Sequence, residues 1–302
     1  MTAKENFMAF YKNPMRPGAD PFILTWEGKY YLYFTGYFCD IPDGYKVFVS
    51  EDMTSWEDGG YCLRKEDVQG DFGFWAPEIT VKDGKFYMVY TSEEHLGIAV
   101  ADSPMGPFVQ KEKKWLSEKK TIDGHFFVDD DGTTYLYYVR LGQGNRIFVA
   151  KMSDDLMTLD EDNERLLIFA EEEWELHQSR VTEGPFVLKH NGLYYLTYSA
   201  NHTKSPFYAV GYAVSDNPMG PFRKYDKNPI LKKNEFVNGP GHPRFTKSKD
   251  GKELICVYHT HHSLEEFVPR MVCCDRAEFV KCEGGDDALV IHGPTVTPQE
   301  AF

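Results

Sequence analysis

The sequence has no long apolar run. None of its 302 residues fall in a stretch approaching the roughly 18 consecutive apolar residues of a membrane-spanning helix. The N-terminal stretch "MTAKENFMAFYKNPMRPG" also lacks the uninterrupted apolar segment of a secretory signal. We therefore expect no membrane partner and a cytoplasmic location.

Basic residues are scarce relative to acidic ones. The chain contains 33 lysines and arginines against 47 aspartates and glutamates, which gives a formal net charge of −14. Because a chain of this charge repels polyanions, nucleic acid and anionic membrane surfaces are excluded as expected partners. The net charge does not exclude neutral ligands.

Cysteine is also sparse, and its spacing carries no metal or redox motif. The six cysteines are Cys39, Cys62, Cys256, Cys273, Cys274 and Cys282. None of them forms a C-x-x-C pair, and neighbours on a strand such as Cys273 and Cys274 point to opposite faces. We expect buried free thiols rather than disulfides.

Long amphipathic helices are missing, whereas strand-forming aromatics are abundant at 15% of the chain. The segment "GADPFILTWEGKYYLYFTGY", from Gly18 to Tyr37, has the pattern of a β-hairpin. The same pattern occurs five times, and successive turn glycines are 48 to 60 residues apart. These turn glycines are Gly28, Gly84, Gly132, Gly192 and Gly251. A third strand follows each hairpin and enters a Pro/Gly turn that would lead to a fourth.

Five units of three or four antiparallel strands predict an all-β, five-bladed β-propeller. Blades arranged around a central channel explain a period of about 50 residues, for which a β-sandwich gives no reason. We treat residues 1–302 as a single catalytic propeller domain. Either "NFMAFYK" or the tail segment "DALVIHGPTV" is expected to complete the last blade.

Polar residues stand where the first strand of each unit begins. They are Asp20, Glu78 with Trp75 just before it, Asp123, Glu183 and His242. In a propeller these positions converge on the central channel, so the acids should lie close together. Crowded carboxylates repel one another and raise one another's pKa, so crowding them costs stability. A purely structural role gives no reason to place several carboxylates at one point. Calcium binding or acid–base chemistry does require such a group.

Each acid also has an ordinary explanation. Asp20 stands before a proline, which is a common way to begin a turn. In the third unit, Asp123 is one of several candidates for the functional acid. The others are Asp129–Asp131 in "DDDG", where acids are typical turn formers. The recurrence of acids at one position of the repeat favours the functional interpretation.

Five motifs in order resemble glycoside hydrolase family 43. They are "ADPFIL", "FWAPEI", "IDGHFFVDDDG", "TEGPFVLKHNGLYYLTYSA" and "GPGHPRF", and they cover the chain from about Asn13 to Arg276. The resemblance implies a five-bladed propeller that inverts the configuration of the sugar. One departure is the third motif, where glycine replaces the proline that often follows the aspartate.

The resemblance also implies the catalytic residues. Asp20 is expected to be the general base, Glu183 the general acid, and Asp123 the residue whose charge keeps Glu183 protonated. No redox cofactor and no covalent intermediate is needed.

Three further residues are expected to bind substrate or line the pocket. Trp75 is either a sugar platform or blade packing, and Glu78 is a wall or binding residue. Arg270 opens the third strand of the last unit and resembles a family arginine that reaches into the pocket, although a rim salt bridge would explain it too.

Histidines are further candidates for holding a metal, and we expect no catalytic metal. His242 is expected to bind substrate, and it leaves open a structural Ca²⁺ in the channel, although simple hydrogen bonding would equally explain it. The segment "YHTHH" places His259 and His261 on one strand face, and a structural role is favoured because no metal-binding spacing surrounds them.

These expectations define an exo-acting enzyme that releases α-L-arabinofuranose or β-D-xylose from plant-derived oligosaccharides. The first alternative is a non-catalytic carbohydrate-binding propeller, which would not need acids at three equivalent positions. The second is a related five-bladed fructan hydrolase or glycoside phosphorylase. A phosphorylase would need a basic phosphate subsite, for which only Arg244 and Arg270 stand near the acids.

Overall fold

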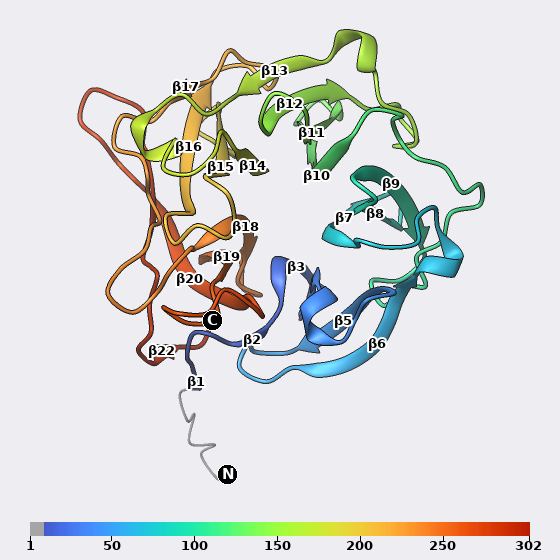
Figure 1. The fold of residues 1–302 in the computed structure, drawn as a ribbon, viewed down its shortest axis with the longest axis horizontal. Helices are drawn as coiled ribbons and strands as arrows, with labels where there is room; N and C mark the ends of the chain where they lie inside the picture. The colour runs from blue at the N-terminus through green and yellow to red at the C-terminus, as the bar shows by residue number, and fades with distance from the viewer. Residues whose placement is uncertain (1–8) are drawn as a thin grey trace.

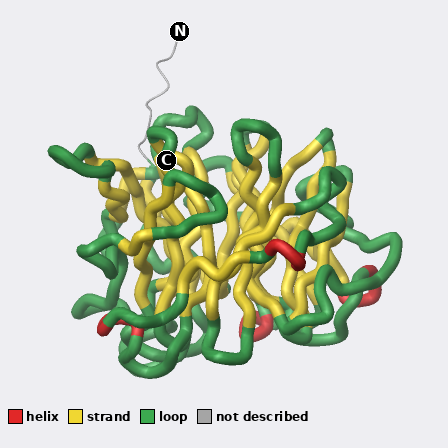
Figure 2. The backbone as a smooth tube through the Cα atoms, turned by 90° about the horizontal axis from the view of Figure 1, so that it is seen from above, coloured by secondary structure: helices red, strands yellow, loops and turns green. Residues whose placement is uncertain are grey.

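The computed structural model describes residues 9–302, and nearly all of its regular structure is β-strand. Five sheets stand in a ring around a central axis, as predicted (Figure 1). Seen from the side, the strands run between two faces formed largely by loops (Figure 2). No helix in this part of the chain is long and apolar enough to cross a membrane.

Each blade is an antiparallel sheet whose first strand is innermost. Blade one contains β3 (Ala19–Trp26), β4 (Lys29–Thr35), β5 (Gly44–Ser50) and β6 (Glu57–Arg64). Blade two contains β7 (Trp75–Lys82), β8 (Lys85–Ser92) and β9 (His95–Ala101). Blade three contains β10 (Thr121–Val128), β11 (Thr134–Arg140), β12 (Arg146–Lys151) and β13 (Arg165–Ile168). Blade four contains β14 (Thr182–His190), β15 (Leu193–Ala200), β16 (Ala209–Ser215) and β17 (Arg223–Lys224). Blade five contains β18 (Gly241–Lys247), β19 (Leu254–Thr260), β20 (Met271–Val280), β2 (Arg16–Pro17) and β21 (Ala288–Ile291). Short 3-10 helices lie between strands at η1 (Tyr37–Cys39), η2 (Lys65–Asp67), η3 (Glu161–Asn163) and η4 (Glu173–Glu175).

Blade two has three strands where the other blades have four or more, which is within the predicted range of three or four. After the Pro/Gly turn that follows β9, the chain returns only as an isolated bridge between Val100 and Val109. The Gln110 side chain then donates to the carbonyl of Ile98, which takes the place of a further backbone pair.

Both ends of the chain contribute to closing the ring. β20 pairs with β2 at Met271 and Val272, and with β21 from Ala277 onward. The prediction for the tail "DALVIHGPTV" is therefore confirmed. The prediction for "NFMAFYK" is wrong in its described part, because β1 (Phe10–Tyr11) pairs with β22 (Gln299–Glu300); residues 6–8 lie outside the described part.

The core is divided among the interfaces between neighbouring blades, with one apolar cluster at each of the five. Buried tyrosines are prominent in these clusters, and two of them donate to backbone carbonyls that follow the third strand of the next blade. Tyr33 donates to the Pro104 carbonyl at 2.6 Å and Tyr137 to the Pro218 carbonyl at 2.5 Å. The aromatic content of the sequence is therefore used to lock each blade to the next.

The five predicted hairpin turns all form at their glycines. Gly28, Gly84, Gly132, Gly192 and Gly251 have φ between 73° and 85°, a region that other residues occupy only with strain. The turn after β10 contains the acidic run at residues 129–131, so those acids are turn residues.

All six cysteines are free, as predicted. Four are buried, but Cys39 is only partly buried and Cys282 is exposed, so the expectation of burial is wrong for these two.

Candidate active site

Each innermost strand begins with the same β-bulge. One extra residue interrupts the pairing of the first two strands of every blade, and it adopts a left-handed conformation with φ between 43° and 59°. The residues in this conformation are Asp20, Ala76, Asp123, Gly184 and His242. Such a conformation costs a non-glycine residue about 1–3 kcal/mol and is held only by its surroundings. Five repeated bulges therefore aim five chain segments at one axis.

The bulge shows that the predicted ring of polar residues mixes three positions. Asp20, Asp123 and His242 occupy the left-handed position itself, whereas Glu183 directly precedes it. Glu78 comes two residues after the left-handed Ala76 and belongs to the next layer along the channel. The sequence holds a signal for this offset, because a proline directly follows the left-handed residue in four blades, at Pro21, Pro77, Pro185 and Pro243.

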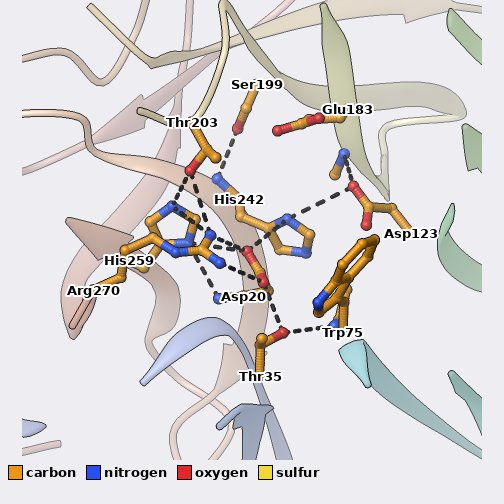
Figure 3. A network of polar contacts seen from close by, with 12 residues as sticks. Asp20, Thr35, Trp75, Asp123, Glu183, Ser199, Thr203, His242, His259 and Arg270 are labelled. Atoms are coloured by element: carbon orange, nitrogen blue, oxygen red, sulfur yellow. Dashed lines mark hydrogen bonds and ion pairs between the residues drawn. The ribbon is translucent and has the colours of Figure 1, made fainter. Parts of the chain in front are cut away.

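A cavity of about 600 Å³ opens at the bulged ends of the inner strands, and segments from all five blades line it. Six of the predicted site residues reach it, namely Asp20, Trp75, Asp123, Glu183, His242 and Arg270. Figure 3 shows these side chains pointing toward one another around the axis. The seventh, Glu78, does not line the cavity and is 2% exposed.

Asp20 is held as a carboxylate. Arg270 donates to both of its oxygens, at 2.7 Å to Oδ1 and 3.2 Å to Oδ2, and Thr35 donates to Oδ2 at 2.7 Å (Figure 3). Burial acts to raise the pKa of Asp20, but Arg270 together with His242 and His259 outweighs it and holds the pKa well below its usual range. Asp20 is therefore ionised at neutral pH.

Glu183 has the opposite environment. Burial is the main cause that raises its pKa to about 7, and the negative charge of Asp20 adds to the effect. Hydrogen bonds from Tyr208 to Oε1 and from Asn145 to Oε2, both at 2.9 Å, act against this shift without cancelling it. Below about pH 7, Glu183 can therefore carry a proton.

Asp123 lies beside Glu183, and the two acids titrate together. Burial and then the charge of Glu183 raise the pKa of Asp123 well above its usual range. Because each carboxylate disfavours ionisation of the other, the pair holds one proton over a wide range of pH.

A substitution in the repeat explains how Asp123 is oriented. The residue that pairs with the start of each inner strand is Thr35, Thr91, Ser199 or His259 in four blades, and its side chain accepts the bulge N–H of the next blade. In blade three this residue is Val139, which cannot accept a hydrogen bond. The Gly184 N–H donates instead to Asp123 Oδ2 at 3.0 Å, which fixes Asp123 next to Glu183.

The histidines of the site are engaged in hydrogen bonds and aromatic contacts. His259 accepts the Asp20 N–H at 3.1 Å and stacks on Tyr208, and His261 lies within 2.9 Å of the Thr203 carbonyl. Burial keeps the pKa of His242 well below its usual range, so the ring is neutral. Within residues 9–302 no three side chains of metal-ligating type are arranged to hold an ion. A structural Ca²⁺ near His242 stays a prediction, and we derive no step through a metal.

Glu78 is the centre of a buried ion cluster below the cavity. Its Oε2 lies 2.7 Å from Arg244 Nε, and its Oε1 lies 2.6 Å from His125 Nδ1. His125 Nε2 accepts the Val187 N–H at 3.0 Å, so the proton sits on Nδ1 and is donated to Glu78. Arg244 also donates to the Gly184 carbonyl at 3.2 Å. The cluster joins the inner strands of blades two to five under the three acids.

Sequence reasoning missed four functional neighbours or underrated them. Thr35, Tyr208 and Asn145 hold the acids, and His259 supports the backbone of Asp20. Asn145 could have been found from the sequence, because it directly precedes the third strand of its blade, which is the position that Arg270 has in blade five. Thr35, by contrast, sits at the end of a strand where a polar residue is unremarkable.

This chain is similar to known proteins in sequence, and to solved structures in fold. Residues 11–281 match the family described as Glycosyl hydrolases family 43. A solved structure described as an endo-1,4-beta-xylanase from Bacteroides thetaiotaomicron is 40% identical, with a TM-score of 0.88, and the match covers 96% of this chain and 98% of that one.

Two curated relatives have comparable coverage. Xylosidase/arabinosidase 43A of Humicola insolens is 31% identical over 83% of this chain and 85% of its own length. The extracellular exo-alpha-(1->5)-L-arabinofuranosidase of Streptomyces chartreusis is 30% identical, over 84% of each chain.

Proposed function

The chain belongs to family 43 of the glycosyl hydrolases and is a glycoside hydrolase, and we propose that it is an exo-acting, inverting member that releases a terminal pentose. The pentose is α-L-arabinofuranose or β-D-xylose, in line with the relatives that carry xylosidase and arabinofuranosidase names. The observation that carries the proposal is the contrast between two acids in one cavity: Asp20 is held ionised, and Glu183 has a pKa of about 7.

That contrast provides the two groups that single displacement needs. Asp20 takes a proton from a water on one face of the anomeric carbon, and Glu183 gives its proton to the departing oxygen on the other face. Asp123 acts on Glu183, because a second negative charge beside it disfavours loss of the proton. Asp123, Asp20 and Glu183 thus have separate roles although all three line one cavity.

Exo action is in line with the curated relatives, whose names include a xylosidase/arabinosidase and an exo-arabinofuranosidase. Residues from every blade surround the cavity, including Phe38 of blade one and Phe267 of the loop before β20.

The alternatives receive less support. A purely binding propeller is set aside by the family, which is one of hydrolases. A phosphorylase would need a phosphate site beside the acids, where Arg270 is paired with Asp20 and Arg244 with Glu78, so that Lys204 is the cavity-lining cation without an ion pair within residues 9–302.

The test uses the basicity of the leaving group. Glu183→Ala should strongly slow hydrolysis of a natural disaccharide, yet retain much more activity on a dinitrophenyl glycoside, whose leaving group needs no proton. Asp20→Ala is the matched comparison, and both substrates should then fall together by at least about 100-fold, because both need an activated water. If Glu183→Ala slowed both substrates equally, Glu183 would not be the acid.

A further inference from the structure

A second, smaller pocket adjoins the wall of the cavity between blades three and four. Its volume is about 260 Å³, and it is lined by Gln143, Arg146, Leu166, Phe169, Ala170 and Arg180. We call it the rim pocket. Its size is on the scale of one sugar ring rather than of a chain.

The rim pocket and the catalytic cavity share the two chain segments that separate them. The Asn145 N–H donates to the Arg180 carbonyl, and the Thr182 N–H donates to the Asn145 carbonyl, each at 3.1 Å. Asn145 and Val181 line the catalytic cavity, whereas their neighbours Arg146 and Arg180 line the rim pocket. The two sites are therefore held at a fixed distance by backbone hydrogen bonds.

The guanidinium groups of the rim pocket lack carboxylate partners. Within residues 9–302, neither Arg146 nor Arg180 forms an ion pair, and Arg146 Nε is buried without any hydrogen bond. Arg140, which faces Arg146 on the neighbouring strand, is paired with Glu161 and Glu164. In a chain with a net charge of −14, two cations left unpaired in one pocket favour an anionic ligand.

The rest of the lining suits a sugar that carries this anion. Leu166 and Phe169 are 43% and 42% exposed, which leaves apolar surface for the face of a ring. An apolar wall with a few placed donors is the usual composition of a small-ligand site. Among sugars, a carboxylate marks the uronic acids.

The rim pocket also lies on the side where the departing sugar must be. Asn145 holds Glu183, and Glu183 protonates the departing oxygen in the proposed mechanism. The part of the substrate beyond that oxygen therefore extends over the shared wall. Resting on the proposed function, we propose that the rim pocket is a subsite for a uronic acid in the departing part of the substrate, with Arg146 and Arg180 binding its carboxylate.

The experiment compares two substrates that differ in one group. One is an oligosaccharide whose departing part carries a hexuronic acid, and the other is the same compound with the carboxyl reduced to a primary alcohol. For the unaltered protein, kcat/KM should favour the acid by about 10-fold or more, as expected for charge-assisted hydrogen bonds. Added salt should reduce this ratio.

Substitutions locate the effect. Arg146→Met and Arg180→Met should each lower the ratio, and together bring it close to one. Arg64→Met is the matched control, because it removes the same charge from the exposed end of β6 in blade one and should leave the ratio unchanged. A ratio near one in the unaltered protein, or one that survives both pocket substitutions, overturns the proposal.

Two additional measurements separate this inference from the proposed function. Hydrolysis of simple nitrophenyl pentosides, which have no sugar in the departing part, reports the function alone. Calorimetric binding of the free uronic-acid oligosaccharide and of its reduced form reports the rim pocket without catalysis. Absence of pentoside hydrolysis would therefore refute the function, while equal binding of the two oligosaccharides would refute the subsite.

Discussion

The buried pair of Glu78 and Arg244 offers a prediction whose size follows from the structure. Both residues are 2% exposed, and Arg244 Nε lies 2.7 Å from Glu78 Oε2. Arg244→Met leaves the glutamate charged and without its cation, and Glu78→Gln leaves the arginine charged. Removing one partner of a buried pair costs about 3–5 kcal/mol of unfolding free energy, because the remaining charge stays desolvated.

The double variant distinguishes an ion pair from two independent contacts. With both charges gone, neither partner is left alone, so Arg244→Met/Glu78→Gln should be destabilised by less than the sum of the single changes. For residues in direct contact we expect a coupling energy of about 2–3 kcal/mol. His125 keeps its partner, because the glutamine carbonyl can still accept from Nδ1.

Urea unfolding at pH 7 measures all four free energies. The control is Lys85→Met, which removes the cation of a pair that lies on the surface, with Asp102 86% exposed. This variant should unfold almost as the unaltered protein does, because solvent screens such pairs. Additive single changes, or a cost for Arg244→Met no larger than that of the control, would refute the account of a buried ion cluster.

Two further predictions concern the pH dependence of kcat/KM. The rate should fall as pH rises through about 7, where Glu183 loses its proton. Asp123→Asn should move this alkaline limb to lower pH, because it removes the negative charge that Asp123 carries beside Glu183 in the proposed mechanism. An alkaline limb that does not move would leave Asp123 as a binding or turn residue. Arg270→Met should move the acidic limb to higher pH, because the pKa of Asp20 is low through this cation and the base must be ionised. An unchanged acidic limb would mean that another group sets it.

The blades and the meeting of the acids could be predicted because they rest on local signals. Turn glycines such as Gly28 and Gly132 need a left-handed backbone, and strand-forming residues flank them. Once the repeat is recognised, its symmetry brings Asp20 and Asp123 to one axis.

The details of the site could not be predicted, because they depend on pairing between distant strands. The bulge that moves Glu78 out of the cavity is a matter of register, with Trp75 opposite Thr91 and Glu78 opposite Val89. A strand shifted by one residue presents its other face, and the sequence marks the shift only through the proline that follows the left-handed residue in four blades. Closure by Arg16 and Pro17 likewise depends on Met271 and Val272, some 250 residues away in the chain.

The most direct test of the central claim is the configuration of the first sugar released. If Asp20 activates water and Glu183 protonates the departing oxygen, the displacement is single and the product first appears with the opposite anomeric configuration. Proton NMR during early turnover, before the free sugar equilibrates, reports this configuration. The account predicts inversion; retention would show that a carboxylate attacks the sugar, and the role given to Asp20 would be wrong.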